Sequence, residues 1–134
     1  MLEKVKFEKL QILDLRWNKI SDINILENVN FKELKELNLS NNKISEIKVL
    51  EKVNFKKSEK LDLSRNKIAD INILENVNFK ELKELYLSHN KISDIKVLEK
   101  VKFEKLEKLN LSYNEIDENK YSSIINNLKF NIHI

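Results

Sequence analysis

The chain has 134 residues, of which 41% are hydrophobic and 35% charged, and its formal net charge is +3. This composition is typical of one globular domain, and 25 basic against 22 acidic residues give no electrostatic argument for nucleic acid. Cysteine, glycine and proline are absent, which excludes disulfides, thiol catalysis, glycine-rich phosphate loops and the glycine-flanked serine of hydrolases.

The first segment, residues 1–9, lacks the apolar run of a signal peptide, and no stretch is apolar and long enough to span a membrane. Residues 2–9 are identical to residues 98–105, so the chain is expected to start inside a repeat and to leave an uncapped end. Sequons at Asn38 and Asn110 fall inside predicted strands. Together with the lack of cysteine, they lead us to expect a cytoplasmic location.

From residue 10 onward a 24-residue unit recurs, at 10–33, 34–57, 58–81, 82–105 and 106–116. Asparagine and phenylalanine mark this step at Asn18, Asn42, Asn66, Asn90 and Asn114, and at Phe7, Phe31, Phe55, Phe79 and Phe103. A longer 48-residue period is superimposed, because residues 21–34 nearly equal residues 69–82. One repeat domain is therefore predicted, with Ser58 standing where the other units carry leucine.

Each unit predicts one short strand and one helical turn. The alternation in Leu37-Asn38-Leu39 is typical of a strand, and the spacing in Leu50–Val53 suits a single helical turn. Strands one unit apart must then be parallel, with like residues stacked. We expect the repeated asparagines to bond neighbouring backbone and to adopt the left-handed conformation that glycine would otherwise supply.

Residues 117–134 depart from the repeat and predict a C-terminal cap. A helical stripe of apolar residues spans 117–128, with Asp117 as a candidate N-cap. Alternating apolar residues then predict a last strand. The stripe is Tyr121, Ile124, Ile125 and Leu128, and the strand positions are Phe130, Ile132 and Ile134.

The unit L-x-x-L-x-L-x-x-N-x-I-x-x-I-x-x-L-x-x-V-x-F-x-x resembles the leucine-rich repeat family. Its tail is most similar to the bacterial internalins and to the regulator of protein phosphatase 1, although the unit is two residues longer around the phenylalanine. The resemblance implies an α/β solenoid, a right-handed coil with a curved parallel sheet on its concave face and short helical turns on its convex face. It also implies a non-enzymatic module that recruits or regulates partner proteins.

The pair Ser88-His89 suggests catalysis at first sight, but four of the five units carry the same serine, so we interpret it as part of the repeat. Asp14 and Asp62 share a column, yet two strand steps separate them by roughly 10 Å, too far to chelate one ion. We therefore predict no enzyme activity, no catalytic residue, no metal site and no cofactor.

One column varies where the rest of the unit hardly changes: Trp17, Asn41, Arg65, His89 and Tyr113. Three residues earlier a second column holds Asp14, Asn38, Asp62, Tyr86 and Asn110. We expect both columns to project from the concave face, and Trp, Tyr and Arg are the residue types that dominate binding hot spots. The alternative is that an exposed position simply drifts. The predicted partner-binding residues are Asp14, Arg16, Trp17, Asn41, Asp62, Arg65, Tyr86, His89 and Tyr113.

Charges elsewhere do not form a basic stripe. Along the predicted sheet Glu36, Lys60, Glu84 and Lys108 alternate in sign. Lysine follows the first four repeated asparagines, and we interpret these lysines as paired with acids three residues later. We therefore predict a protein or peptide ligand and no nucleic acid or membrane. The alternative hypothesis is a structural module that is monomeric or self-associates weakly through its uncapped N-terminal end, which light scattering would detect.

Overall fold

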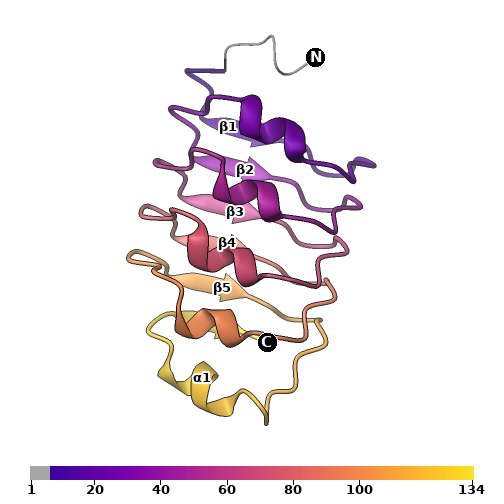
Figure 1. Cartoon of the computed structure of the whole chain (residues 1–134), viewed down its shortest axis with the longest axis vertical. Coiled ribbons are helices and arrows are strands. Elements are labelled where there is room, and N and C mark those ends of the chain that lie inside the picture. Colours follow the sequence, from indigo (N-terminus) through magenta and orange to yellow (C-terminus); the bar gives the residue numbers. More distant parts are fainter. Residues whose placement is uncertain (1–6) are drawn as a thin grey trace.

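A computed structural model describes residues 7–134, which form a stack of coils with one strand in each (Figure 1). The six strands make one parallel sheet in sequence order. They are β1 (Ile12–Asp14), β2 (Glu36–Asn38), β3 (Lys60–Asp62), β4 (Glu84–Tyr86), β5 (Lys108–Asn110) and β6 (Asn131–His133). The α/β solenoid predicted from the repeat is confirmed; most of the opening partial unit, residues 1–6, lies outside the described residues.

The 24-residue period sets the register of the sheet. Leu37 pairs with Leu13 on one side and with Leu61 on the other, so identical positions of successive units align. Charged residues on neighbouring coils therefore meet, as in the ion pair between Lys57 Nζ and Glu33 Oε1 at 2.7 Å. The repeat thus converts a sequence period into columns of neighbouring side chains.

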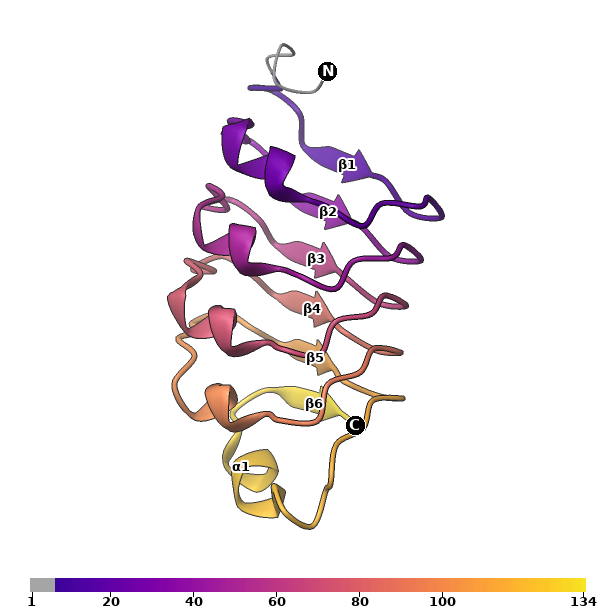
Figure 2. The same cartoon turned by 45° about the vertical axis from the view of Figure 1, so that its right-hand side comes forward.

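Short 3-10 helices cover the face of the sheet opposite to the outward strand residues (Figures 1 and 2). They are η2 (Asn24–Asn28), η3 (Lys48–Glu51), η4 (Asn72–Asn76) and η5 (Lys96–Glu99). The predicted helical turn at Leu50–Val53 therefore begins two residues earlier, at Lys48. Their alternating lengths of five and four residues follow the 48-residue period of the sequence.

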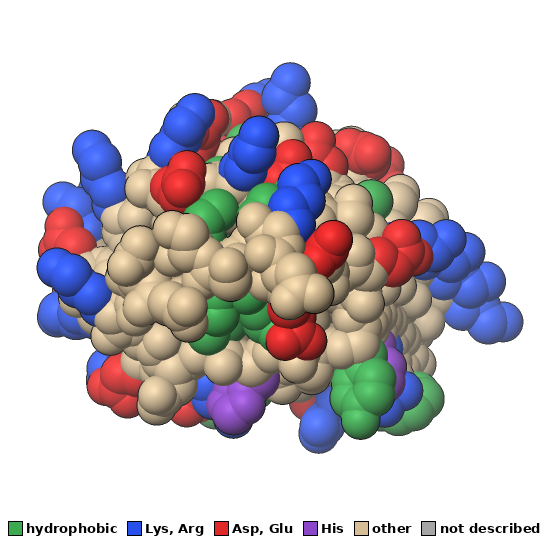
Figure 3. Space-filling model, turned by 90° about the horizontal axis from the view of Figure 1, so that it is seen from below, with side chains coloured by type: hydrophobic (Ala, Val, Ile, Leu, Met, Phe, Trp, Pro, Cys, Tyr) green, Lys and Arg blue, Asp and Glu red, His purple; other side chains and the backbone are tan. Residues whose placement is uncertain are grey.

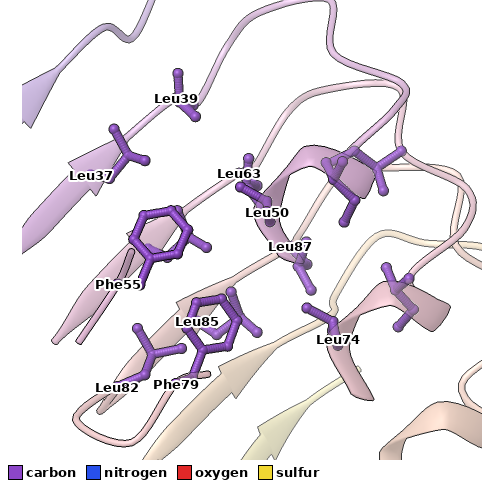
Figure 4. Close-up of a cluster of buried hydrophobic side chains, with 14 of the residues drawn as sticks. Leu37, Leu39, Leu50, Phe55, Leu63, Leu74, Phe79, Leu82, Leu85 and Leu87 are labelled. Atoms are coloured by element: carbon purple, nitrogen blue, oxygen red, sulfur yellow. The ribbon is translucent and has the colours of Figure 1, made fainter. Parts of the chain in front are cut away.

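The core lies between the sheet and the 3-10 helices, as the cluster in Figure 4 shows, and buried residues continue it from coil to coil. Its inward strand residues are buried; Leu61 and Leu85, for example, are 1% and 0% exposed. Phenylalanines stack from coil to coil, with ring centroids 5.7 Å apart between Phe55 and Phe79. Because each coil contributes only one layer of this core, each depends on its neighbours for stability.

The helix of the C-terminal cap is shorter than the stripe over residues 117–128 predicts. Helix α1 spans Ser122–Asn127, and Tyr121 stands at its N-cap without a side-chain cap bond. Asp117 instead caps the preceding turn, where its Oδ1 accepts a hydrogen bond from the Lys120 amide at 3.1 Å. The predicted last strand is β6, in which Ile132 pairs with Leu109.

Candidate partner-binding surface

After each of the first five strands the chain turns through a residue with positive φ, and these five turns form a row beside the C-terminal ends of the strands (Figure 2). The five residues have φ between 53° and 59° and are those of the variable column: Trp17, Asn41, Arg65, His89 and Tyr113. The prediction that the repeated asparagines adopt this conformation is therefore wrong. The left-handed residue is the one immediately before each asparagine.

The repeated asparagines instead hold the turns together. Asn66 donates from its Nδ2 to the carbonyls of Leu63 and Ser64 in its own coil and to that of Leu39 in the preceding coil. Its Oδ1 accepts the amide of Ile44, also in the preceding coil. The predicted bonding to neighbouring backbone is confirmed. It explains the turn, because the chain must reverse just before the asparagine for one amide to reach all these groups.

The second column, which begins with Asp14, also stabilises the turns. Oδ1 of Asp14 accepts the amide of Arg16 at 3.1 Å, and Oδ1 of Asp62 accepts the amide of Ser64 at 2.9 Å. These are Asx turns, which the short carboxylate makes with the backbone two residues on. Asp14 also pairs with the Arg16 side chain at 3.0 Å, so both residues have partners within their own turn.

Three residues of the variable column contact one another. The rings of His89 and Tyr113 are stacked, with centroids 4.3 Å apart and planes 11° from parallel. On the other side of His89, Nη2 of Arg65 lies 3.4 Å from Nε2. Viewed from the C-terminal end, Figure 3 shows hydrophobic, histidine and basic side chains gathered at one corner of the molecule. Arg65, His89 and Tyr113 are thus one continuous surface over three coils.

Tyr86 lies on the outward face of the sheet, among groups that the sequence analysis did not assign to the site. Its hydroxyl donates to Oε2 of Glu84 at 2.6 Å. The ammonium nitrogens of Lys60 and Lys108 lie 5.5 and 5.1 Å from its ring centroid. Burial, and then the hydrogen bond to Glu84, raise the pKa of Tyr86 to about 12. The alternating signs at 24-residue steps were the signal for these neighbours.

Trp17 stands apart from that cluster, at the N-terminal end of the row, with 75% of its surface exposed. Nearby, a shallow hollow in the sheet face brings together the predicted residues Asp14, Arg16 and Asp62. Asn41 is half-buried in the second turn. The predicted residues therefore fall into two groups beside the C-terminal ends of the strands.

Ser88 Oγ donates to Ser64 Oγ at 3.1 Å, in the preceding coil, while His89 contacts Arg65 and Tyr113. The predicted pairing of turn lysines with acids is wrong in residues 7–134, where no such ion pair forms. Asp70 instead accepts the amide of Asn72 at the start of η4.

Within residues 7–134 no three His, Asp or Glu side chains lie close enough to hold a metal ion together. No helix in the same range has the length and apolar character needed to cross a membrane.

The family model for leucine-rich repeats in two copies matches residues 8–52, 59–100 and 80–129, which is most of the chain. The chain belongs to the leucine-rich repeat family. This assignment and the six-stranded solenoid confirm the resemblance drawn from the repeated unit. No curated protein matches the sequence.

Solved leucine-rich-repeat structures resemble this chain over almost all of its length. Internalin C2 from Listeria monocytogenes is 28% identical with a TM-score of 0.73, over 95% of this chain and 51% of that one. A second internalin from the same organism is 27% identical with a TM-score of 0.63, over 95% of this chain and 43% of that one. A leucine-rich-repeat protein from Leptospira interrogans is 25% identical with a TM-score of 0.68, over 95% of this chain and 38% of that one. The chain thus spans about half or less of these structures.

Proposed function

We propose that the chain is a non-enzymatic module that binds a partner protein or peptide through the outward face of its sheet and the adjoining row of turns. The family assignment supports the general class, since leucine-rich repeats commonly mediate interactions between proteins. The partner-binding residues are those predicted from the sequence, to which Lys60, Glu84 and Lys108 are added. The cytoplasmic location stays a prediction.

The positive φ angles of the variable column are the main support for this proposal. A residue with a Cβ loses about 1–2 kcal/mol in the left-handed conformation, and only Gly, Asn, Asp and His occupy it readily. Asn41 and His89 suit the position, but Trp17, Arg65 and Tyr113 do not. Neutral drift under this constraint would favour glycine and asparagine, so large side chains here argue for a selected contact surface.

A pull-down tests the proposal with the chain and its variant Trp17→Ala/Arg65→Ala/Tyr113→Ala. Alanine keeps the Cβ and removes the exposed side chains, so we expect proteins retained by the wild type to be lost. The matched control is Lys19→Ala/Lys67→Ala/Lys91→Ala, which truncates exposed side chains two residues further along the same kind of turn. Equal capture by wild type and column variant would show that the column does not bind the partner.

A further inference from the structure

We infer that the surface over the third to fifth coils, residues 58–116, binds an extended acidic segment of a protein, with two carboxylates four residues apart. This surface, here called the basic ring patch, consists of Arg65, Tyr86, His89, Lys108 and Tyr113. The inference rests on the proposed function and specifies the chemistry of its partner.

The patch combines two groups of contacts, each made of rings and one cation. Arg65 lies against His89 at 3.4 Å, and His89 stacks on Tyr113 at 4.3 Å between centroids. One strand over, Lys108 Nζ lies 5.1 Å from the centroid of Tyr86. Rings offer a partner apolar area at low entropic cost, while the cations offer charge-assisted hydrogen bonds.

The cations of the patch have no carboxylate of their own. In the described range, 7–134, neither Arg65 nor Lys108 has a carboxylate oxygen within 4.0 Å, whereas Glu84 is shared between the Tyr86 hydroxyl at 2.6 Å and Lys60 at 3.8 Å. Asp62, the nearest acid on β3, uses Oδ1 to accept the Ser64 amide. Two positive charges therefore remain available to a partner.

Spacing defines the ligand more closely. Arg65 and Lys108 belong to coils two strand steps apart, which corresponds to roughly 10 Å across a sheet. Lys108 aligns with Lys60, so Arg65 also lies five residues further along its coil, and the diagonal between the two positions is between roughly 10 and 19 Å. Residues i and i+4 of an extended chain are about 13 Å apart and project from the same face. An extended segment that runs across the strands can thus place one carboxylate on each cation and an apolar side chain on the rings between them.

The N-terminal coils have the opposite character. Their outward strand positions carry Ile12, Asp14, Glu36 and Asn38, and their arginine, Arg16, is already paired with Asp14 at 3.0 Å. A nucleic acid would need more phosphate contacts than two cations supply, next to Glu84 and Asp62. Charge complementarity thus favours an acidic peptide segment.

Fluorescence anisotropy with a defined probe tests the inference. The probe is a labelled, acetylated nonapeptide with glutamate at its third and seventh positions, phenylalanine at its fifth, and glycine and serine elsewhere. A twin peptide carries lysine in place of both glutamates. We expect the glutamate peptide to bind the full chain at least about tenfold more tightly than its twin, and more weakly as salt rises.

Variants with reversed charge locate the site. Arg65→Glu and Lys108→Glu should each weaken binding of the glutamate peptide at least about fivefold. Lys48→Glu, on η3 at the opposite face, changes the net charge equally and should leave binding unchanged; circular dichroism checks the folding of all three.

Four results would overturn the inference. They are equal binding of the two peptides, no binding of either, equal weakening by the control variant, and displacement of the probe by an equimolar thymidine oligonucleotide. Loss of a dimer in Arg65→Glu, seen by light scattering with no peptide binding, would assign the patch to a second copy and also overturn it. In each case a partner captured through the variable column leaves the proposed function standing.

Discussion

The positive-φ residues show how single side chains affect stability and binding in opposite directions. Asn41 and Trp17 have nearly the same φ, 56° and 59°, in equivalent turns. Asparagine tolerates this conformation and tryptophan does not, so the two turns differ in conformational energy while the fold around them is the same. Trp17 is also 75% exposed, so little packing offsets its backbone energy.

Replacing Trp17 by asparagine should therefore stabilise the protein. We expect Trp17→Asn to raise the free energy of unfolding by about 0.5–1 kcal/mol, since the backbone strain is relieved and little packing is lost. Urea denaturation followed by circular dichroism measures the change. Trp17→Ala, which retains a Cβ in the same conformation, should give no such gain. A destabilised asparagine variant would mean that the indole contributes more than the backbone loses.

The raised pKa of Tyr86 should lower the free energy of unfolding in strongly alkaline solution. Its pKa in the folded chain is about 12, against an ordinary value of 10.0, because burial and then the bond to Glu84 favour the neutral phenol. Between these values the unfolded chain loses a proton that the folded chain keeps, so this contribution is complete below pH 10 and is lost as the pH rises toward 12.

An absorbance titration near the phenolate band checks this shift. The wild type should show one tyrosine that titrates near pH 12, and Tyr86→Phe should lack this transition. The phenylalanine variant should also lose less stability between pH 10 and 12 than the wild type. Identical titrations of the two proteins would contradict the assignment.

At the scale of one coil, the strand and its register followed from the 24-residue period, because identical residues can only stack when strands are parallel. The bonding of Asn66 followed from its amide, which offers donors and an acceptor to backbone on two coils. The left-handed residue was misplaced because Arg65 and Tyr113 are types that give no signal for that conformation. Its position depends on the closure of the whole coil around the asparagine, which local propensity does not contain.

The neighbours of Tyr86 were only partly predictable for a similar reason. The period places Lys60, Glu84 and Lys108 on the same face, and the sequence analysis found their alternating signs. Which ammonium lies against a ring depends on side-chain conformations, which a pattern of one-letter codes does not fix. The same is true of the stacking between His89 and Tyr113.

Ser58 replaces the leucine that begins each of the other four units, and it occupies a buried core position. Its residue is 1% exposed and its hydroxyl donates to the carbonyl of Leu34 at 3.2 Å. Leu34 and Leu82 fill the same place in the neighbouring coils, both 0% exposed. The coil geometry therefore accommodates leucine, and serine contributes one hydrogen bond in place of apolar burial.

We expect Ser58→Leu to raise the melting temperature by about 3 °C, since the added apolar burial exceeds the lost hydrogen bond by about 1 kcal/mol. Differential scanning calorimetry measures the change. Ser45→Leu, at an exposed turn position, controls for added hydrophobicity and should give no increase. An unchanged or lower melting temperature for Ser58→Leu would mean that the third coil is packed around serine.

At the scale of the whole molecule, each coil is stabilised by its neighbours, and the C-terminal cap covers one end of the stack. Tyr121 is 3% exposed, and its hydroxyl donates to Oδ1 of Asp94 at 3.1 Å, 27 residues away. It thus connects the segment before α1 to the turn before η5. β6 in turn covers β5, where the Leu111 amide donates to the carbonyl of His133.

Removing this anchor should loosen the stack from one end. In Tyr121→Ala we expect hydrogen exchange at the Leu111 amide to accelerate far more than at the Leu39 amide, three coils away, because neighbouring coils stabilise each other in sequence. Tyr121→Phe keeps the ring in the core and loses only the bond to Asp94, so its effect should be smaller at both amides. Equal acceleration at Leu111 and Leu39 would show that the coils unfold as one cooperative unit. The cap would then stabilise the entire stack, including the turn of Trp17 at the far end.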